Sequence, residues 1–468
     1  MTRLSKGLFA GLLALLPVAG LAQSPRSIKG PDDRFKADIL VVVAHPDDEA
    51  AVTPYLARAT YDEHKRVAVV YGTRGGSGAN EYRRETGPAL ADVREQEARQ
   101  TCAALGITNV WFLDGKDTAS QNVLESLANW GHGKNLEEMV RLVRLTRPDV
   151  IITWLPGVFI GEDHGDHQAA GVLATEAFDL ANDATVFPSQ VAGASKRLEP
   201  YLENLTPWQP KKIYYFSDAN DEKQFVGTGP AYSIKEVPAS QRKPYWRLAL
   251  DAAKSHVTQF PNEIEQLSKM SDAQLQQMID NPNTGWWRDP LTLIFGKSLV
   301  SGKPTDDVFA HITDRIPEYR PQSAHIMKTV VAAQPLELGG PWAFYSHFYP
   351  AHDLTNLPAP KTPEIGIKAG TILSVPLILL HDETRPLEVE LKIAAPDSWK
   401  ILGGAGKLLL PAEKSTALRV EIETPLLSPE ALKNTQLQEI TVSAYENEKT
   451  IGEVKLRVKL ISGGLPQN

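Results

Sequence analysis

Cysteine is almost absent from this chain, which has only Cys102 among its 468 residues. A single thiol cannot form an intramolecular disulfide, and it cannot supply a cysteine-based zinc finger or an iron–sulfur site. Any metal site in this protein must therefore be built from histidine and carboxylate side chains.

The chain also lacks an excess of basic charge. Its 49 Lys and Arg against 57 Asp and Glu give a formal net charge of −8, which provides no electrostatic indication of nucleic-acid binding. No G-x-G-x-x-G run follows the first predicted strand, and neither a P-loop nor a G-x-S-x-G elbow is present. Dinucleotide binding therefore has no support in the sequence.

Long apolar runs are confined to the N-terminus. The run Leu8–Val18 follows two basic residues and precedes Gly20 and Ala22, which are spaced like positions −3 and −1 of a signal-peptidase site. We predict that residues 1–22 are a removable signal and that the mature protein is secreted or periplasmic; the alternative is an uncleaved anchor. No second run is long enough to cross a bilayer, so we expect no stable membrane insertion.

Strand-like and helix-like patterns alternate from Ala37 to Phe216. The first predicted strand, Ile39–Val43, is a continuous apolar run typical of a strand buried on both faces. The other predicted strands are Val67–Tyr71, Val110–Leu113, Val150–Trp154 and Lys212–Phe216. The helical patterns between them cover Glu49–Tyr61, Pro88–Leu105, Leu136–Leu145 and His167–Leu180. This alternation predicts an α/β fold with a parallel sheet and helices on both faces. Functional sites in such folds lie beyond the carboxyl ends of the strands.

The length of the chain predicts more than one domain. We assign residues 23–216 to the α/β catalytic domain and residues 217–360 to a mostly helical extension that completes it. Within this extension, the pattern at Asn262–Met278 predicts a helix. From residue 361 to residue 468 apolar and polar residues alternate with a period of two, as in Leu387–Ile393, which predicts a small Ig-like β-sandwich. A proline-rich stretch at 358–363 is typical of a stiff linker.

Two short segments carry the side chains on which chemistry depends. The segment His45–Glu49 (HPDDE) directly follows the first strand, and His164–His167 (HGDH) follows the fourth. Two histidines and one carboxylate around an open position are a catalytic zinc arrangement, and a nearby carboxylate can take a proton from water. The segments are therefore sufficient for metal-assisted hydrolysis of an amide or ester. The alternative is that the acidic residues of the first segment only cap a helix.

With these motifs, residues 36–260 resemble the PIG-L/LmbE-like zinc-dependent deacetylases. The glycine-rich loop Gly72–Gly78 and the pair Arg94-x-x-Glu97 support the resemblance, as does Lys254-Ser255-His256, which makes His256 a further candidate. The resemblance implies a Rossmann-like fold and hydrolysis of N-acetyl groups, usually from glucosamine-containing substrates.

The resemblance also implies a role for each motif residue. It implies that His45, Asp48 and His167 are the zinc ligands. It makes Asp47 the general base, and it makes His164 the group that stabilises the oxyanion.

Two further residues receive roles in the same way. Arg94 matches an arginine that contacts substrate in some members, and Asp166 would orient a metal-binding histidine through its second ring nitrogen. The chain departs from the family pattern where some members have a mobile tyrosine, because Glu162 and Asp163 occupy that stretch. The loop Gly75–Gly87 is also longer and more polar than in compact members.

Taken together, the sequence predicts an exported zinc-dependent N-deacetylase that acts on an amino sugar or a glycoconjugate. Another divalent metal remains open, because sites with two histidines and one aspartate also accept iron, cobalt or manganese. Two alternatives remain. One is a zinc amidase for a larger acyl or peptide-like amide, and the other is a glycan-binding protein with a vestigial catalytic layer.

Overall fold

A computed structural model provides the coordinates. It describes residues 31–157, 164–193, 203–217, 227–281, 287–316, 335–354, 356–357 and 363–461. The predicted signal segment at 1–22, the pair Glu162 and Asp163, and all but the last residue of the predicted linker lie outside the described residues.

A six-stranded sheet lies at the centre of the N-terminal part, with the strand order β3-β2-β1-β4-β5-β8. Its strands are β1 (Ile39–Val43), β2 (Val67–Thr73), β3 (Asn109–Gly115), β4 (Val150–Trp154), β5 (Lys212–Phe216) and β8 (Ile294–Ser298). The first five are parallel, as predicted, whereas β8 pairs antiparallel with β5 and makes the sheet mixed. The chain order reverses direction between β1 and β4, which is where α/β folds of this kind bind ligands.

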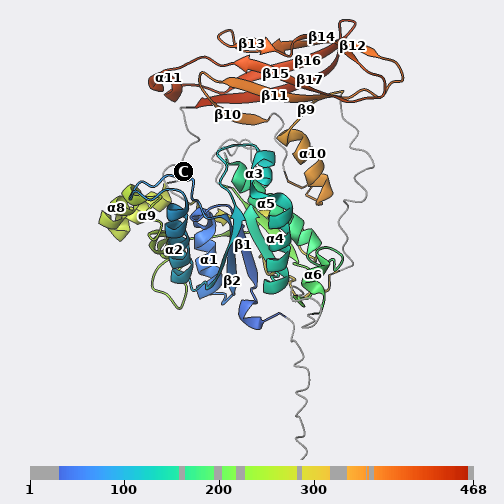
Figure 1. Ribbon diagram of the computed structural model, residues 1–468. Coiled ribbons are helices and arrows are strands. Elements are labelled where there is room, and N and C mark those ends of the chain that lie inside the picture. Colours follow the sequence, from blue (N-terminus) through green and yellow to red (C-terminus); the bar gives the residue numbers. More distant parts are fainter. Residues whose placement is uncertain are drawn as a thin grey trace, which may run out of the picture.

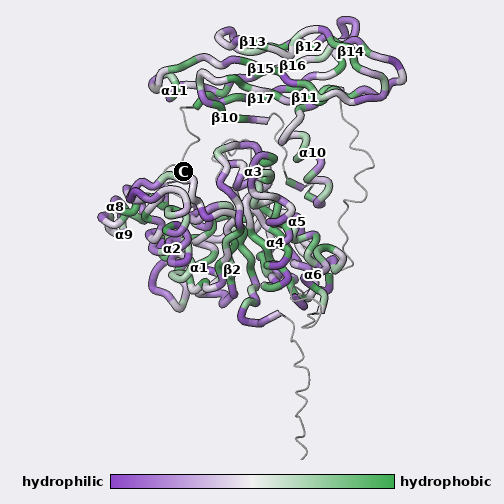
Figure 2. Tube along the Cα trace, viewed as in Figure 1, coloured by the Kyte–Doolittle hydropathy of each residue, from purple (hydrophilic) through white to green (hydrophobic). Residues whose placement is uncertain are grey.

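Helices cover both faces of this sheet (Figure 1). On one face α1 (Thr53–Tyr61) and α2 (Pro88–Ala104) contact α7 (Tyr245–Ala253). On the other face, three helices contact one another: α3 (Val123–Trp130), α4 (His132–Thr146) and α5 (Gly165–Leu180). Every residue of β1 is buried because both of its faces are covered, and Figure 2 shows hydrophobic stretches, drawn in green, at the centre of the sheet.

The helices differ from the sequence prediction in three places. The predicted helix Glu49–Tyr61 begins as a 3₁₀ segment, η2 (Asp48–Val52), and becomes α-helical only at Thr53. Helix α3 was not predicted, and its N-cap is the side chain of Asn122. The pattern expected to be one helix at Asn262–Met278 is two, because Ser271 forms a capping box that starts a new helix.

The remaining small elements of the N-terminal part lie outside the central sheet. They are η1 (Asp33–Phe35), α6 (Pro188–Val191), α8 (Pro261–Lys269), α9 (Asp272–Asp280) and the paired strands β6 (Ala231–Tyr232) and β7 (Leu291–Thr292). Among the described residues, no helix combines the length and the apolar character needed to cross a bilayer.

The C-terminal part is a two-sheet β structure, as the period of two predicted. One sheet has the order β10-β17-β16-β12-β14 and the other β13-β15-β11-β9. Buried residues of both sheets, such as Val389 on β12 and Val420 on β15, form a second core. The strands are β9 (Leu336–Leu338), β10 (Glu364–Lys368), β11 (Ile372–Leu379), β12 (Leu387–Ala394), β13 (Lys400–Gly403), β14 (Gly406–Leu410), β15 (Thr416–Glu423), β16 (Gln438–Glu446) and β17 (Lys449–Ile461), with a short helix α11 (Pro429–Lys433).

The two parts are joined by α10 (Pro341–Ala351), which lies between them in Figure 1. The aromatic side chains Tyr345, Phe348 and Tyr349 of this helix belong to the core of the α/β part. Strand β9, directly before α10, instead pairs with β11 of the sandwich. The sandwich therefore takes one edge strand from a segment that precedes the predicted boundary at residue 361.

Candidate metal centre

The first part of the site is the turn that follows β1. One carboxylate oxygen of Asp48, Oδ2, accepts hydrogen bonds from the backbone N–H groups of Ala44 and His45, at 2.9 and 2.8 Å. The same oxygen accepts a third hydrogen bond, from the indole Nε1 of Trp154 at the end of β4, at 2.8 Å. These three hydrogen bonds fix the orientation of the Asp48 carboxylate, and with it the position of the other oxygen, Oδ1.

That other oxygen, Oδ1 of Asp48, faces two imidazoles. It lies 3.5 Å from Nδ1 of His45 and 3.3 Å from Nε2 of His167. The Trp154 ring stacks on the His167 ring with the centroids 4.2 Å apart and the planes 6° apart, which fixes the orientation of that imidazole. The structure thus brings together all three residues that the resemblance made metal ligands.

These three residues fit a divalent metal. Each offers one ligand atom, and the three atoms lie within 4.8 Å of one another. Two imidazole nitrogens and one carboxylate oxygen are the donor set of many catalytic zinc sites. Although burial acts to raise the pKa of Asp48, the adjacent His167 and His45 outweigh it and hold that pKa well below its usual value. The carboxylate is therefore kept in the ionised form that a metal requires.

Asp166 lies behind this group. Its Oδ2 is 3.3 Å from Nε2 of His45, the nitrogen that does not face Asp48, and it accepts a hydrogen bond from the backbone N–H of Thr118 at 2.7 Å. This is the placement that an orienting carboxylate needs. Burial acts to lower the pKa of His45, but Asp48 and Asp166 outweigh it and raise that pKa to about 9.

His164 is the most exposed of the three histidines, with a side-chain exposure of 27%. Its ring meets the His45 ring edge-on, with the centroids 4.6 Å apart, and its Nδ1 lies 3.7 Å from Asp166 Oδ2, beyond hydrogen-bond distance. Burial, followed by the positive charges of His45 and His167, lowers the pKa of His164 to about 3. A neutral imidazole at the rim of the site can donate one N–H to a bound molecule.

Asp47 stands beside the metal group in an unusual backbone conformation, with φ at 135°. Its backbone N–H donates to Glu49 Oε2 at 3.1 Å, and its Oδ1 accepts a hydrogen bond from Arg94 Nη2 at 2.9 Å. Burial raises the pKa of Asp47 to about 6, even though the Arg94 guanidinium acts to lower it. A carboxylate with such a pKa can take up and release a proton near neutral pH.

Arg94 itself is buried among the residues of the site. Besides Asp47, it donates to the backbone oxygens of Pro46 and Gly75, at 2.8 and 3.1 Å. The side chain is only 5% exposed. The structure therefore gives Arg94 a contact that the sequence did not indicate, the ion pair with Asp47, and contact with a substrate stays a prediction.

The sequence also did not predict the buried contact that holds the last residue of the HPDDE motif. Glu49, the last residue of HPDDE, is fully buried, and its Oε1 lies 2.6 Å from Nε2 of the equally buried His256. His256, a further candidate from the sequence, thus contacts Glu49 of the motif. The tryptophan that supports Asp48 had one sequence signal, its place at the carboxyl end of a predicted strand.

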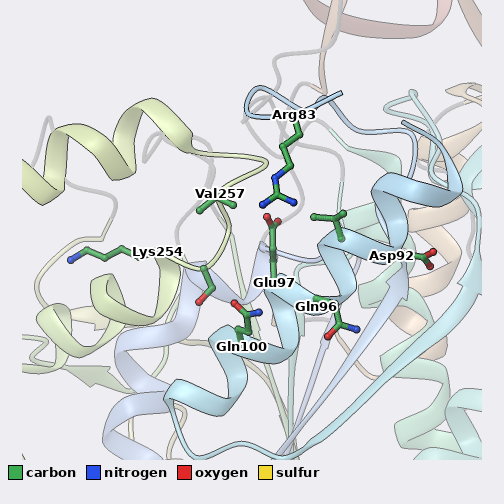
Figure 3. A pocket seen from close by; sticks show the side chains of 9 residues that line it. Arg83, Asp92, Gln96, Glu97, Gln100, Lys254 and Val257 are labelled. Carbon is green, nitrogen blue, oxygen red and sulfur yellow. The ribbon is translucent and has the colours of Figure 1, made fainter. Parts of the chain in front are cut away.

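A cavity of about 520 Å³ lies along α2 and is lined by Arg83, Glu97, Gln100 and Lys254, among others (Figure 3). The Arg83 guanidinium points toward the Glu97 carboxylate, whereas Lys254 extends away from it. None of the predicted metal ligands lines this cavity. The cavity is therefore separate from the candidate metal group around Asp48.

Comparison with known proteins agrees with the resemblance. The family model PIG-L, described as GlcNAc-PI de-N-acetylase, matches residues 40–178. A 1D-myo-inositol 2-acetamido-2-deoxy-alpha-D-glucopyranoside deacetylase 1 of Frankia alni is 30% identical over 188 residues. That alignment covers 36% of this chain and 59% of the relative. A deacetylase 2 of the same description from Frankia casuarinae is 32% identical over 210 residues, covering 40% of this chain and 65% of the relative.

The chain thus spans about three fifths of the length of these curated relatives. Among solved structures, N,N'-diacetylchitobiose deacetylase from Pyrococcus horikoshii aligns with a TM-score of 0.38 and 17% identity. That alignment covers 57% of this chain and 86% of the other.

Proposed function

We propose that this protein is a zinc-dependent N-deacetylase that removes the acetyl group from an acetamido sugar or a glycoconjugate. The observation that carries the proposal is the arrangement of His45, Asp48 and His167 around one point, with the carboxylate of Asp47 beside them. The match to the PIG-L family model and the deacetylase relatives support the same chemistry.

Different residues of the site carry out the different steps of amide hydrolysis. His45, Asp48 and His167 would hold a divalent metal, which when bound would supply a Lewis acid for the amide carbonyl and acidify a water. Asp47 then receives the proton of that water at Oδ2, because Arg94 occupies Oδ1 and no described residue bonds Oδ2. The N–H of neutral His164 donates to the oxygen that becomes negative in the tetrahedral intermediate.

The leaving amine must gain a proton when the carbon–nitrogen bond breaks. Asp47 is suited to this second step, since a carboxyl with a pKa of about 6 can return the proton that it took. The products are acetate and a free amine. Proton uptake and release at one residue account for both steps, and Arg94 holds that residue in place throughout.

The proposed substrate class is supported by the relatives, which are named as deacetylases of an acetamido sugar joined to inositol. We further propose that the chain is exported, on the strength of the apolar run Leu8–Val18 and the small residues after it. An exported enzyme would meet cell-wall or environmental glycans.

The experiment is to measure acetate release from N-acetylglucosamine, chitooligosaccharides and peptidoglycan fragments, and the metal content of the same sample. We expect about one zinc per chain and acetate release that a chelator abolishes. Asp47→Asn should keep the metal and lose roughly 10²- to 10⁴-fold in kcat. Bound zinc without acetate release from any of these substrates would overturn the N-deacetylase assignment.

A further inference from the structure

The connecting helix α10 contacts the first turn of α5 through a buried hydrogen bond. The hydroxyl of Tyr345, on α10, donates to Oε1 of Gln168 at 2.7 Å. Gln168 directly follows His167 in the chain, so the side chain that Tyr345 holds is attached to the backbone of a predicted metal ligand. Both residues are buried, and the hydroxyl therefore contacts Gln168 without competing water.

A second contact reaches the same place from the sandwich itself. The other end of the Gln168 amide, Nε2, donates to the backbone oxygen of Gln121 at 3.1 Å. The side chain of Gln121 in turn accepts a hydrogen bond from the backbone N–H of Gly366, on β10, at 3.1 Å. A Cβ added at Gly366 would lie 3.1 Å from the Gln121 amide nitrogen, so the strand and this side chain are in close contact. The loop after β3 is thus held by α5 on one side and by the sandwich on the other.

This loop is the one that orients Asp166. The backbone N–H of Thr118 donates to Asp166 Oδ2, and the N–H of Gly165 donates to the backbone oxygen of Ser120 at 2.6 Å. Asp166 Oδ2 contacts His45 Nε2. A continuous series of short contacts therefore connects α10 and β10 with two predicted metal ligands, His45 and His167.

We propose that α10 and strand β10 of the sandwich orient the metal centre, with Tyr345 on α10 as a positioning residue that acts through Gln168 and the loop 116–122. The inference rests on the metal site of the proposed function and not on the identity of the substrate. It predicts that loss of the Tyr345 hydroxyl weakens metal binding even when the protein remains folded. Within the described part of the chain, the Tyr345 hydroxyl donates to Gln168 rather than to a ligand atom of the site, so its effect must pass through Gln168.

The test uses the full chain and measures the dissociation constant of zinc by competition with a chromogenic chelator. Tyr345→Phe removes one hydroxyl and keeps the ring in the core, and it should raise the Kd roughly three- to tenfold. Gln168→Met, which removes both amide contacts at similar volume, should raise the Kd at least as much.

A matched control is available at the other end of α5. There Asp179 Oδ2 lies 2.6 Å from Nδ1 of His352, which follows α10, so this pair also joins α10 to α5. His352→Gln should lower the unfolding temperature and leave the zinc Kd within about twofold of the wild type.

Two results would overturn the proposal. One is a Kd within about twofold of the wild type in both Tyr345→Phe and Gln168→Met. The other is an equal rise of the Kd in His352→Gln, because the effect would then be general loosening of α10. Since metal affinity is measured without substrate, failure of the deacetylase assignment would leave this result standing.

Discussion

Arg94 and Asp47 form a nearly buried ion pair, with Nη2 of the guanidinium 2.9 Å from Oδ1 of the carboxylate. The pair lies beside the candidate metal ligands, and it fixes a residue whose backbone is already in a strained conformation, with φ at 135°. The guanidinium therefore has two effects on Asp47, since it orients the carboxylate and it stabilises the ionised form.

Replacing the guanidinium should move the pH dependence of the reaction. The proposed base works only when ionised, so activity falls as the pH decreases through the pKa of Asp47, about 6. Arg94→Met removes the positive charge that lowers this pKa. The pKa of Asp47 must then rise, and the acidic limb of kcat/KM must move to higher pH. Arg94→Lys keeps a positive charge and should move the limb less. Identical limbs in the wild type and Arg94→Met would contradict the role of Asp47 as the base.

The indole of Trp154 should contribute to metal affinity. Its N–H donates to the oxygen of Asp48 that does not face the histidines. Trp154→Phe removes this donor and leaves an aromatic ring beside His167, and the zinc Kd should rise about 10- to 100-fold. Trp208→Phe is the control, because Trp208 donates to the backbone oxygen of Pro148. Equal Kd values in the two variants would show that the indole donor does not matter.

The buried pair of Glu49 and His256 should be important for folding stability. His256→Leu leaves the Glu49 carboxylate without this partner in a fully buried position, and should lower the free energy of unfolding by about 3–5 kcal/mol. The double variant Glu49→Leu/His256→Leu should lose less than the sum of the two single variants, since it leaves neither group alone. Denaturant unfolding of all four proteins measures this coupling, and additive losses would mean that the contact carries no interaction energy.

Removal of the metal should lower the free energy of unfolding, because the metal site exists only in the folded protein. A metal that binds only the folded protein stabilises it by about 4 kcal/mol when its free concentration is 1,000 times its Kd. A chelator should therefore lower the unfolding temperature that calorimetry measures for the wild type. Asp48→Asn, which weakens the ligand that faces both histidines, should show a smaller shift. A wild-type transition that is unaffected by the chelator would argue against a metal at this position.

The residues that determine the parallel sheet could be predicted because their signal is local. The run Ile39–Val43 is apolar throughout, and the structure has a strand with the same bounds. Strand β8 gave no such signal, because Gly296 and Lys297 interrupt it. A Cβ at Gly296 would lie 2.5 Å from the Tyr215 ring, so the glycine is required by a neighbour that is remote in sequence.

The candidate site shows the same division between local and remote information. His45 and Asp48 converge across a single turn, which their spacing predicts. The partner of Asp47 is 47 positions away, and only the packing of α2 onto the turn after β1 brings Arg94 there. The sequence therefore identifies which residues are chemically competent, whereas tertiary packing determines which of them act on one another.

The division of the chain between its two cores has a consequence for any attempt to separate them. Leu336 on β9 is fully buried against the sandwich. A Cβ added at Gly452 on β17 would lie 2.8 Å from the Cβ of Leu336. Tyr345, nine positions later, is buried in the α/β core. A fragment that begins at residue 361 would lose an edge strand, and a fragment that ends at 360 would expose the leucine that covered the sandwich. The α/β part and the sandwich should therefore be expressed together, because no cut at a single peptide bond separates their two cores.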